Sequence, residues 1–203
     1  MVERDRDAAG RAANARPRDR YGRPLPPGST GVPRIPDDLD LPPDQTLSYA
    51  QQLLDDGLAF NAHEVLEAAW KKGPATERML WQGLAQYAVG LTHIQRGNPK
   101  GARTLLTRAV GRLSAFDPTT EGRPADALPY RIDGPGLIAH AEALLSALAA
   151  GATIPDNRLM PRLRTDPPAE HGTDRPRDPR RAESTAQPHP APDTYHGEDV
   201  DRP

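Results

Sequence analysis

The prolines of this chain are distributed unevenly, and their distribution determines which part can fold into regular structure. Of 24 prolines in 203 residues, eight lie in residues 1–43 and ten in residues 152–203, but only six lie in residues 44–151. The apolar residues are concentrated in that middle segment. A segment rich in Pro, Arg and Asp cannot bury enough apolar surface to offset the entropy lost on ordering. We therefore expect disordered tails at 1–43 and 152–203 and one folded domain at 44–151.

Apolar residues in the middle segment recur with the period of an α-helix, and no stretch alternates with the period of a β-strand. Between Leu80 and Ile94, for example, they recur every three or four residues. Five helices are predicted in this way, so the expected fold class is all-α. They are expected to begin near Asp44, Asn61, Ala75, Asn98 and Asp133.

The predicted helix ends rest on capping residues. Asp44, Asn98 and Asp133 are predicted N-cap residues, and Asn61 followed by Glu64 has the form of a capping box. Several predicted helices are followed by a glycine, which favours the left-handed conformation found after a helix C-terminus. These glycines are Gly57, Gly73, Gly97 and Gly151.

An internal repeat with an offset of 40 residues relates the first two predicted helices to the next two. Gly57 aligns with Gly97, and Leu66 aligns with Leu106. The short connections between these helices favour antiparallel neighbours. We expect a five-helix bundle built on two stacked helical hairpins, similar to tetratricopeptide folds.

The second predicted helix carries the most unusual side chains. His63 and Glu67 are four residues apart and so share one helix face, with Phe60 and Trp70 on or near the same side. Burying a histidine and a carboxylate beside aromatic rings is costly unless both have polar partners. We therefore expect such partners on a neighbouring helix.

The third predicted helix offers these partners. Gln82, Gln86 and His93 form a polar line beside its apolar stripe. If the second and third helices are antiparallel, the two polar lines face each other. The expected cluster contains His63, Glu67, Gln82 and Gln86, with Glu64, Trp70 and His93 at its margins.

Three interpretations of this cluster remain open. It is a buried hydrogen-bond network that fixes the helix register, a pocket for a small molecule or protein partner, or a metal or acid–base site. The metal signal is weak, because the run His63-Glu64-x-x-Glu67 lacks the second histidine of a zinc-protease motif. We expect no cofactor and no metal, with His63 and Glu67 as the weak candidate ligands.

Composition excludes several classes of function. The chain has no cysteine, so disulfides, thiol catalysis and Cys-type zinc sites are excluded. No apolar run is long enough for a signal peptide or a membrane span, so the expected location is the cytoplasm. The net charge of −2 argues against nucleic acid as a partner. At most, the eight arginines in residues 1–34 make weak contacts with polyanions.

Three motifs in order resemble those of the domain of unknown function 309 family, found in bacteria, archaea and plastids. They are Ala-His-Glu-Val-Leu-Glu-Ala-Ala-Trp at 62–70, Gln-Gly-Leu-Ala-Gln at 82–86 and Gly-Asn-Pro-Lys-Gly-Ala at 97–102. The resemblance covers about residues 47–113. It implies an all-α fold without an established activity, and it maps the family's polar residues onto His63, Glu64, Glu67, Gln82 and Gln86.

The sequence therefore predicts a small helical binding or interaction module, with an unknown small molecule or protein as partner. The alternative is a metal-dependent, hydrolase-like enzyme that uses Glu64 or Glu67 as base and His63 as ligand or acid.

Overall fold

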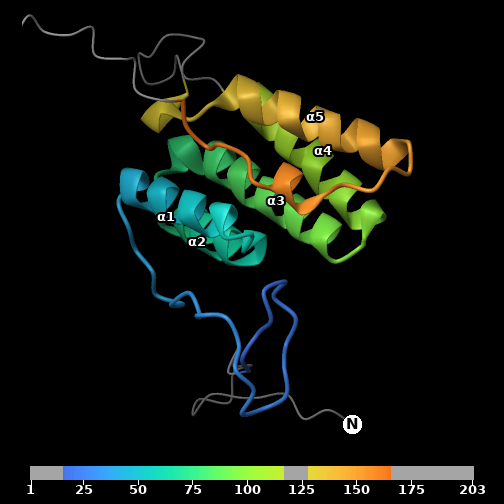
Figure 1. Ribbon diagram of the computed structural model, residues 1–203. Coiled ribbons are helices and arrows are strands. Elements are labelled where there is room, and N and C mark those ends of the chain that lie inside the picture. The colour runs from blue at the N-terminus through green and yellow to red at the C-terminus, as the bar shows by residue number, and fades with distance from the viewer. Residues whose placement is uncertain (1–15, 117–127, 166–203) are drawn as a thin grey trace, which may run out of the picture. The chain divides into compact units, whose positions relative to one another are not determined.

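Five α-helices follow one another along the chain in the computed structural model, which describes residues 16–116 and 128–165 (Figure 1). They are α1 (Pro43–Asp55), α2 (Ala59–Lys72), α3 (Arg78–Gln95), α4 (Pro99–Ala115) and α5 (Gly134–Ala149). Within the same described residues, three short 3-10 helices lie between or after them: η1 (Ala75–Glu77), η3 (Pro129–Arg131) and η4 (Asp156–Leu159). Within the two described ranges there is no β-strand, so the predicted all-α class is confirmed there.

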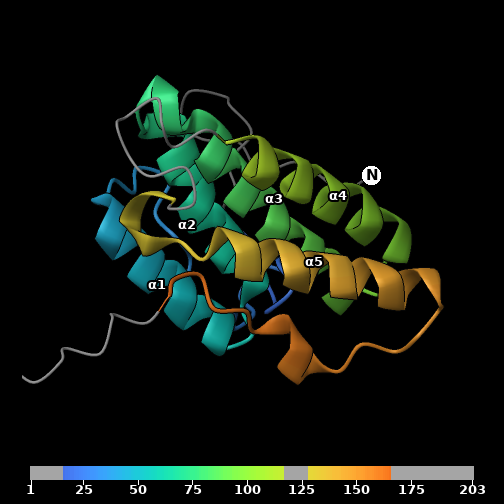
Figure 2. The same ribbon diagram turned by 90° about the horizontal axis from the view of Figure 1, so that it is seen from above.

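Each α-helix packs against the next one in the chain, and α3 lies between α2 and α4 (Figures 1 and 2). The apolar stripe predicted on α3 forms the centre of the core, where Leu80, Leu84 and Leu91 are fully buried. The backbones of α3 and α4 approach closely, because a Cβ atom at Gly90 would lie 2.7 Å from Leu106 Cγ. A glycine at this position is therefore a requirement of helix packing.

Several helix ends agree with the sequence prediction. The Asn98 side chain accepts a hydrogen bond from Gly101 N at 3.0 Å, and Asp133 accepts one from Gly136 N at 2.9 Å. Both residues are the N-caps of their helices, as predicted. After α1 and α3 the chain turns at Gly57 and Gly97, whose φ angles of 72° and 67° favour glycine.

Two predicted caps are wrong. The first helix begins at Pro43, and Asp44 lies in its first turn without capping it. The second begins at Ala59, so Asn61 lies inside α2, where it is buried and its amide donates to Pro33 O at 2.9 Å. The Asn61 side chain, which the local sequence predicts to cap the helix, forms a tertiary hydrogen bond instead.

The segment before α1, residues 16–42, packs against the helices. Ile35 is 5% exposed and belongs to the hydrophobic core. Side chains of the helices hold the segment by its carbonyl groups: Arg96 Nε donates to Tyr21 O at 2.7 Å, and Lys72 Nζ to Asp38 O at 2.6 Å. This part of the chain is anchored mainly by polar contacts to its backbone.

The segment after α5, residues 152–165, also contributes to the core, through Leu159 and Leu163. The Gln51 side chain on α1 holds it at two points, donating to Pro161 O at 3.0 Å and accepting from Leu163 N at 2.8 Å. The packed unit is therefore longer at both ends than the expected 44–151.

The remaining expectations about architecture stay predictions. The predicted disorder of residues 1–15 and 166–203 lies outside the described residues. The order of the helices is compatible with two stacked hairpins of the tetratricopeptide type and does not by itself establish them. In the part of the chain that the structure describes, no helix combines the length and apolar character needed to cross a bilayer.

Candidate functional site

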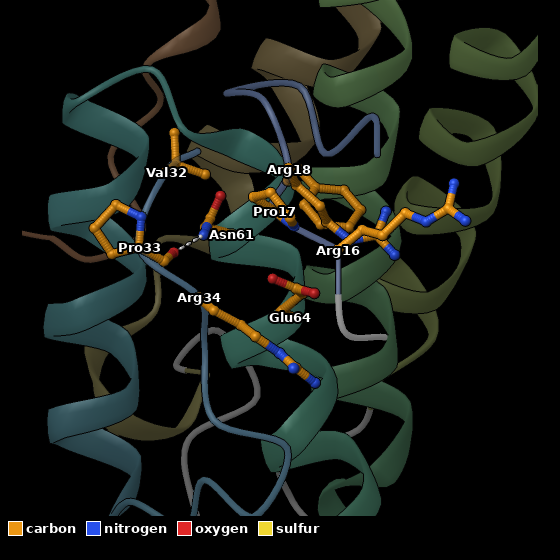
Figure 3. A pocket seen from close by; sticks show the side chains of 9 residues that line it. Arg16, Pro17, Arg18, Val32, Pro33, Arg34, Asn61 and Glu64 are labelled. Atoms are coloured by element: carbon orange, nitrogen blue, oxygen red, sulfur yellow. Dashed lines mark hydrogen bonds between the residues drawn. The ribbon is translucent and has the colours of Figure 1, made fainter. Parts of the chain in front are cut away.

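A pocket of about 240 Å³ lies between the first half of α2 and residues 16–34 (Figure 3). Helix α2 contributes one aromatic ring, one amide and one carboxylate, from Phe60, Asn61 and Glu64. The segment before α1 contributes the opposite wall, with three guanidinium groups among short apolar side chains. These residues are Arg16, Pro17, Arg18, Val32, Pro33 and Arg34.

Glu64 is the one acidic residue in the pocket lining, and Figure 3 shows its carboxylate between Arg34 on one side and Arg16 and Arg18 on the other. Burial raises the pKa of Glu64 above its usual value, and the positive charges of Arg18 and Arg34 offset this only in part. Among the described residues, Glu64 makes neither a hydrogen bond nor an ion pair. Its carboxylate therefore lies in the pocket without a direct partner.

Asn61 lies one helical turn before Glu64 and is 3% exposed. Its Nδ2 donates to Pro33 O, which fixes the orientation of the amide and identifies the other atom as the oxygen. That Oδ1 atom is buried and has no hydrogen-bond donor within the described ranges. Native proteins rarely leave such a group unsatisfied, but this atom is fully covered and does not face the open pocket.

Phe60 joins α2 to the segment that closes the pocket. The guanidinium carbons of Arg18 and Arg96 lie 5.3 Å and 5.5 Å from the centre of its ring, within the range of cation–π contacts. Gly22 lies against the same ring, because a Cβ atom there would be 2.2 Å from Phe60 Cγ. Gly22 also has a φ of 74°, so both space and backbone conformation favour glycine.

His63 and Glu67 do lie together on α2, as the sequence predicts. His63 Nε2 is 3.7 Å from a Glu67 carboxylate oxygen, and Lys71 Nζ is 3.2 Å from the other. Burial lowers the pKa of His63 below its usual value, and the charge of Glu67 reverses this effect only in part. The Nδ1 atom of His63 is buried and lacks a hydrogen-bond partner among the described residues.

The other predicted site residues do not form a closed hydrogen-bond network with His63 and Glu67. Gln82 accepts from Arg112 Nε at 2.8 Å, a contact with α4 rather than with α2. Trp70 Nε1 and Gln86 Oε1 are buried and lack partners within residues 16–116 and 128–165. His93 Nδ1 bonds to Asn98 Nδ2 at 3.0 Å, at the turn between α3 and α4.

The pocket combines residues that sequence reasoning found with residues that it missed. It placed Glu64 at the margin of the cluster, and Glu64 is the one residue of that cluster that lines the pocket. It assigned Arg16, Arg18 and Arg34 to a disordered tail. One signal in the sequence could have indicated this packing. The apolar residues Val32 and Ile35 lie close to Arg34 and show that this part of the segment can pack against a helix.

The described side chains offer limited means of holding a metal ion. No group of three or more His, Asp or Glu residues converges among them. His63 and Glu67 supply two possible ligands, and one carboxylate oxygen of Glu67 already forms an ion pair with Lys71. A metal site at His63 and Glu67 therefore stays a prediction based on two groups.

Comparison with known proteins finds similarity over part of this chain. Over 57 residues it is 40% identical to the "Uncharacterized protein YpuF" of Bacillus subtilis (strain 168), a stretch that covers 28% of this chain and 33% of that relative. No solved structure matches the chain. The matching family model covers residues 47–105, which include α2 and α3 but not the segment 16–34. Residues 47–105 are therefore similar to the family described as "Domain of unknown function (DUF309)".

Proposed function

We propose that this chain is a binding module that holds a small molecule in the pocket between α2 and residues 16–34. The observation that carries the proposal is the Glu64 carboxylate, which lies in a concave, partly apolar pocket without a hydrogen bond or ion pair from any described residue. Small-molecule sites characteristically combine apolar walls with a few convergent polar groups. A desolvated carboxylate is costly unless a partner compensates it, and a ligand supplies that partner.

The volume of the pocket sets the size of its occupant. At about 240 Å³ it is smaller than the sites of roughly 300–1,000 Å³ that accept drug-sized ligands. Its apolar walls, formed by Pro17, Val32, Pro33 and Phe60, provide contacts for a few carbon atoms. A ligand of metabolite size fits these dimensions better than a polymer does.

The ionisable groups in the pocket favour binding over catalysis. Three of the four groups that line it are arginines, which stay protonated and do not exchange protons with a substrate at neutral pH. Glu64 is the one proton acceptor among these lining residues, and none of them is a serine, threonine, lysine or histidine. The pocket thus offers charge and shape, without a pair of groups for acid–base or nucleophilic chemistry.

The metal-dependent hydrolase alternative has less support. It requires His63, Glu64 and Glu67 to act on one centre, but Glu64 lines the pocket while His63 and Glu67 do not. Metal analysis of the purified full-length protein tests this alternative. Stoichiometric zinc, manganese or iron that is lost in the His63→Ala variant would favour the enzyme and count against the binding module.

The binding proposal is tested by adding four small probes to the full-length protein: acetate, inorganic phosphate, ethylammonium and L-leucine. A bound probe should shift the backbone amide signals of Phe60, Asn61 and Glu64. A probe present at 100 times its Kd stabilises the folded state by about 2.7 kcal/mol. For a chain of this length, the midpoint of thermal unfolding then rises by about 5–10 °C.

The matched control is a second glutamate on a helix surface. Glu142 is exposed on α5, far along the chain from the pocket residues, so Glu142→Gln should leave binding unchanged. Glu64→Gln should change the affinity for any probe that binds. If none of the four probes shifts the three amide signals at its solubility limit, the binding proposal is wrong.

A further inference from the structure

The unpartnered carboxylate on α2 defines one side of the pocket's ligand. Glu64 lines the pocket and receives no hydrogen bond from any described residue. An ionised carboxylate is an acceptor only. The ligand part that contacts α2 must therefore bring hydrogen-bond donors, and beside a carboxylate a positive charge is favoured.

The opposite wall requires the opposite charge. Arg34 donates from one nitrogen to Asp37 at 2.5 Å, which leaves most of its five N–H donors available for an acceptor in the pocket. Arg16 and Arg18 line the same wall and add positive charge. A carboxylate matches the planar fork of a guanidinium group and is the simplest anion that binds there.

A ligand with a single charge fits only half of this pocket. A simple anion would meet Glu64, and a simple cation would meet three arginines. A pocket of about 240 Å³ has room for one small molecule that carries both charges. Pro17, Val32 and Phe60 leave an apolar surface beside the charged groups, where a short hydrocarbon side chain is desolvated.

Building on the proposed binding function, we infer that the ligand is a zwitterion, an α-amino acid with an apolar side chain. Its ammonium group binds Glu64, its carboxylate binds Arg34, and its side chain lies against Phe60 and Val32.

The test compares L-leucine with two molecules that each lack one of its charged groups. 4-Methylpentanoate is leucine without the amino group, and 3-methylbutylamine is leucine without the carboxylate. Calorimetric titration of the full-length protein should show that leucine binds at least tenfold more tightly than either analogue. The amide signals of Phe60, Asn61 and Glu64 should shift during the titration, which locates binding in the pocket.

Two variants assign the charges to the two walls. Glu64→Gln should lower the affinity for leucine to that for 4-methylpentanoate. The affinity for 4-methylpentanoate itself should not fall. Arg34→Gln should lower the affinities for leucine and for 4-methylpentanoate by the same factor. The affinity for 3-methylbutylamine should not fall. Thermal unfolding of each variant, with Glu142→Gln as control, verifies that the fold is retained.

The outcomes separate this inference from the proposal on which it rests. If 4-methylpentanoate or 3-methylbutylamine binds in the pocket as tightly as leucine, the zwitterion inference is wrong and the binding module stands. If acetate or phosphate shifts the pocket signals but leucine does not, the same conclusion holds. If no probe or analogue shifts them, both the inference and the proposed function are wrong.

Discussion

Replacing Phe60 by alanine should release residues 16–34 from α2 while leaving the helices folded. The Phe60 ring contacts two guanidinium groups, those of Arg18 and Arg96, and Gly22 lies against the same ring. Each cation–π contact at a partly exposed site contributes about 0.5–1 kcal/mol. Only the Arg18 contact joins the ring to the segment, because Arg96 follows α3. The variant therefore loses about 0.5–1 kcal/mol of the free energy that holds the segment on the helix.

Trypsin cleavage measures this release directly. The bonds after Arg18 and Arg20 are the relevant targets, because the residues after Arg16 and Arg23 are prolines. When local opening is fast compared with cleavage, the cleavage rate follows the population of the open form. A loss of about 0.5–1 kcal/mol corresponds to a factor of roughly 2–5, so Phe60→Ala should be cut at these bonds about 2–5 times faster than the original protein.

The chain contains one other phenylalanine, which provides a matched control. Phe116 follows α4 and packs against the core without contacting residues 16–34 in any described interaction. Phe116→Ala should lower the midpoint of thermal unfolding but leave cleavage after Arg18 and Arg20 unchanged. Equal cleavage rates in the original protein and in Phe60→Ala, or an equal increase in both variants, would refute this account of the segment.

Three further predictions concern stability. Asn98→Ala removes a cap worth about 1 kcal/mol, so the thermal midpoint should fall by about 2–4 °C, and an unchanged midpoint would contradict the cap. Burial lowers the pKa of His63, His93 and His140, so the unfolded chain takes up protons there first as the pH falls. Denaturant unfolding should therefore show full stability above about pH 6.5 and a loss below it; equal stability at pH 7.5 and 5.5 would contradict this. Glu67→Ala should lower the free energy of unfolding by less than about 1 kcal/mol in the same assay, because the side chain is 32% exposed and its ion pair with Lys71 is at the surface.

The helices could be predicted from the sequence because their signals are local. The caps at Asn98 and Asp133 and the turns at Gly57 and Gly97 depend only on residues within one turn of each helix end. Asn61 shows the limit of this reasoning. Its amide has the right position for a cap, but it bonds to Pro33 O, 28 residues earlier in the chain.

The site could be predicted only in part, for a related reason. The run from Phe60 to Glu67 stands out by its residue types, and Glu64 is among them. Which of these side chains share a pocket depends on residues 16–34, whose composition is that of an unfolded tail. Their packing relies on bonds to their backbone carbonyls, such as those from Asn61 and Arg96, and composition does not report such bonds.

The interhelical polar line shows the same limit. Gln82 and Gln86 have the spacing expected of partners for α2, yet Gln82 bonds to Arg112 on α4. A helix between two neighbours presents polar residues at two boundaries, and spacing alone does not decide which neighbour a given side chain contacts.

The central claim is that Glu64 is a desolvated carboxylate without a partner until a ligand binds. Its titration, followed through the carboxyl carbon signal by NMR in the full-length protein, tests this claim most directly. The account predicts a Glu64 pKa above the usual value in the free protein, because burial is the largest influence on it. Saturating L-leucine should lower this pKa, because an ammonium group favours the ionised form. A pKa at or below the usual value in the free protein would contradict the account.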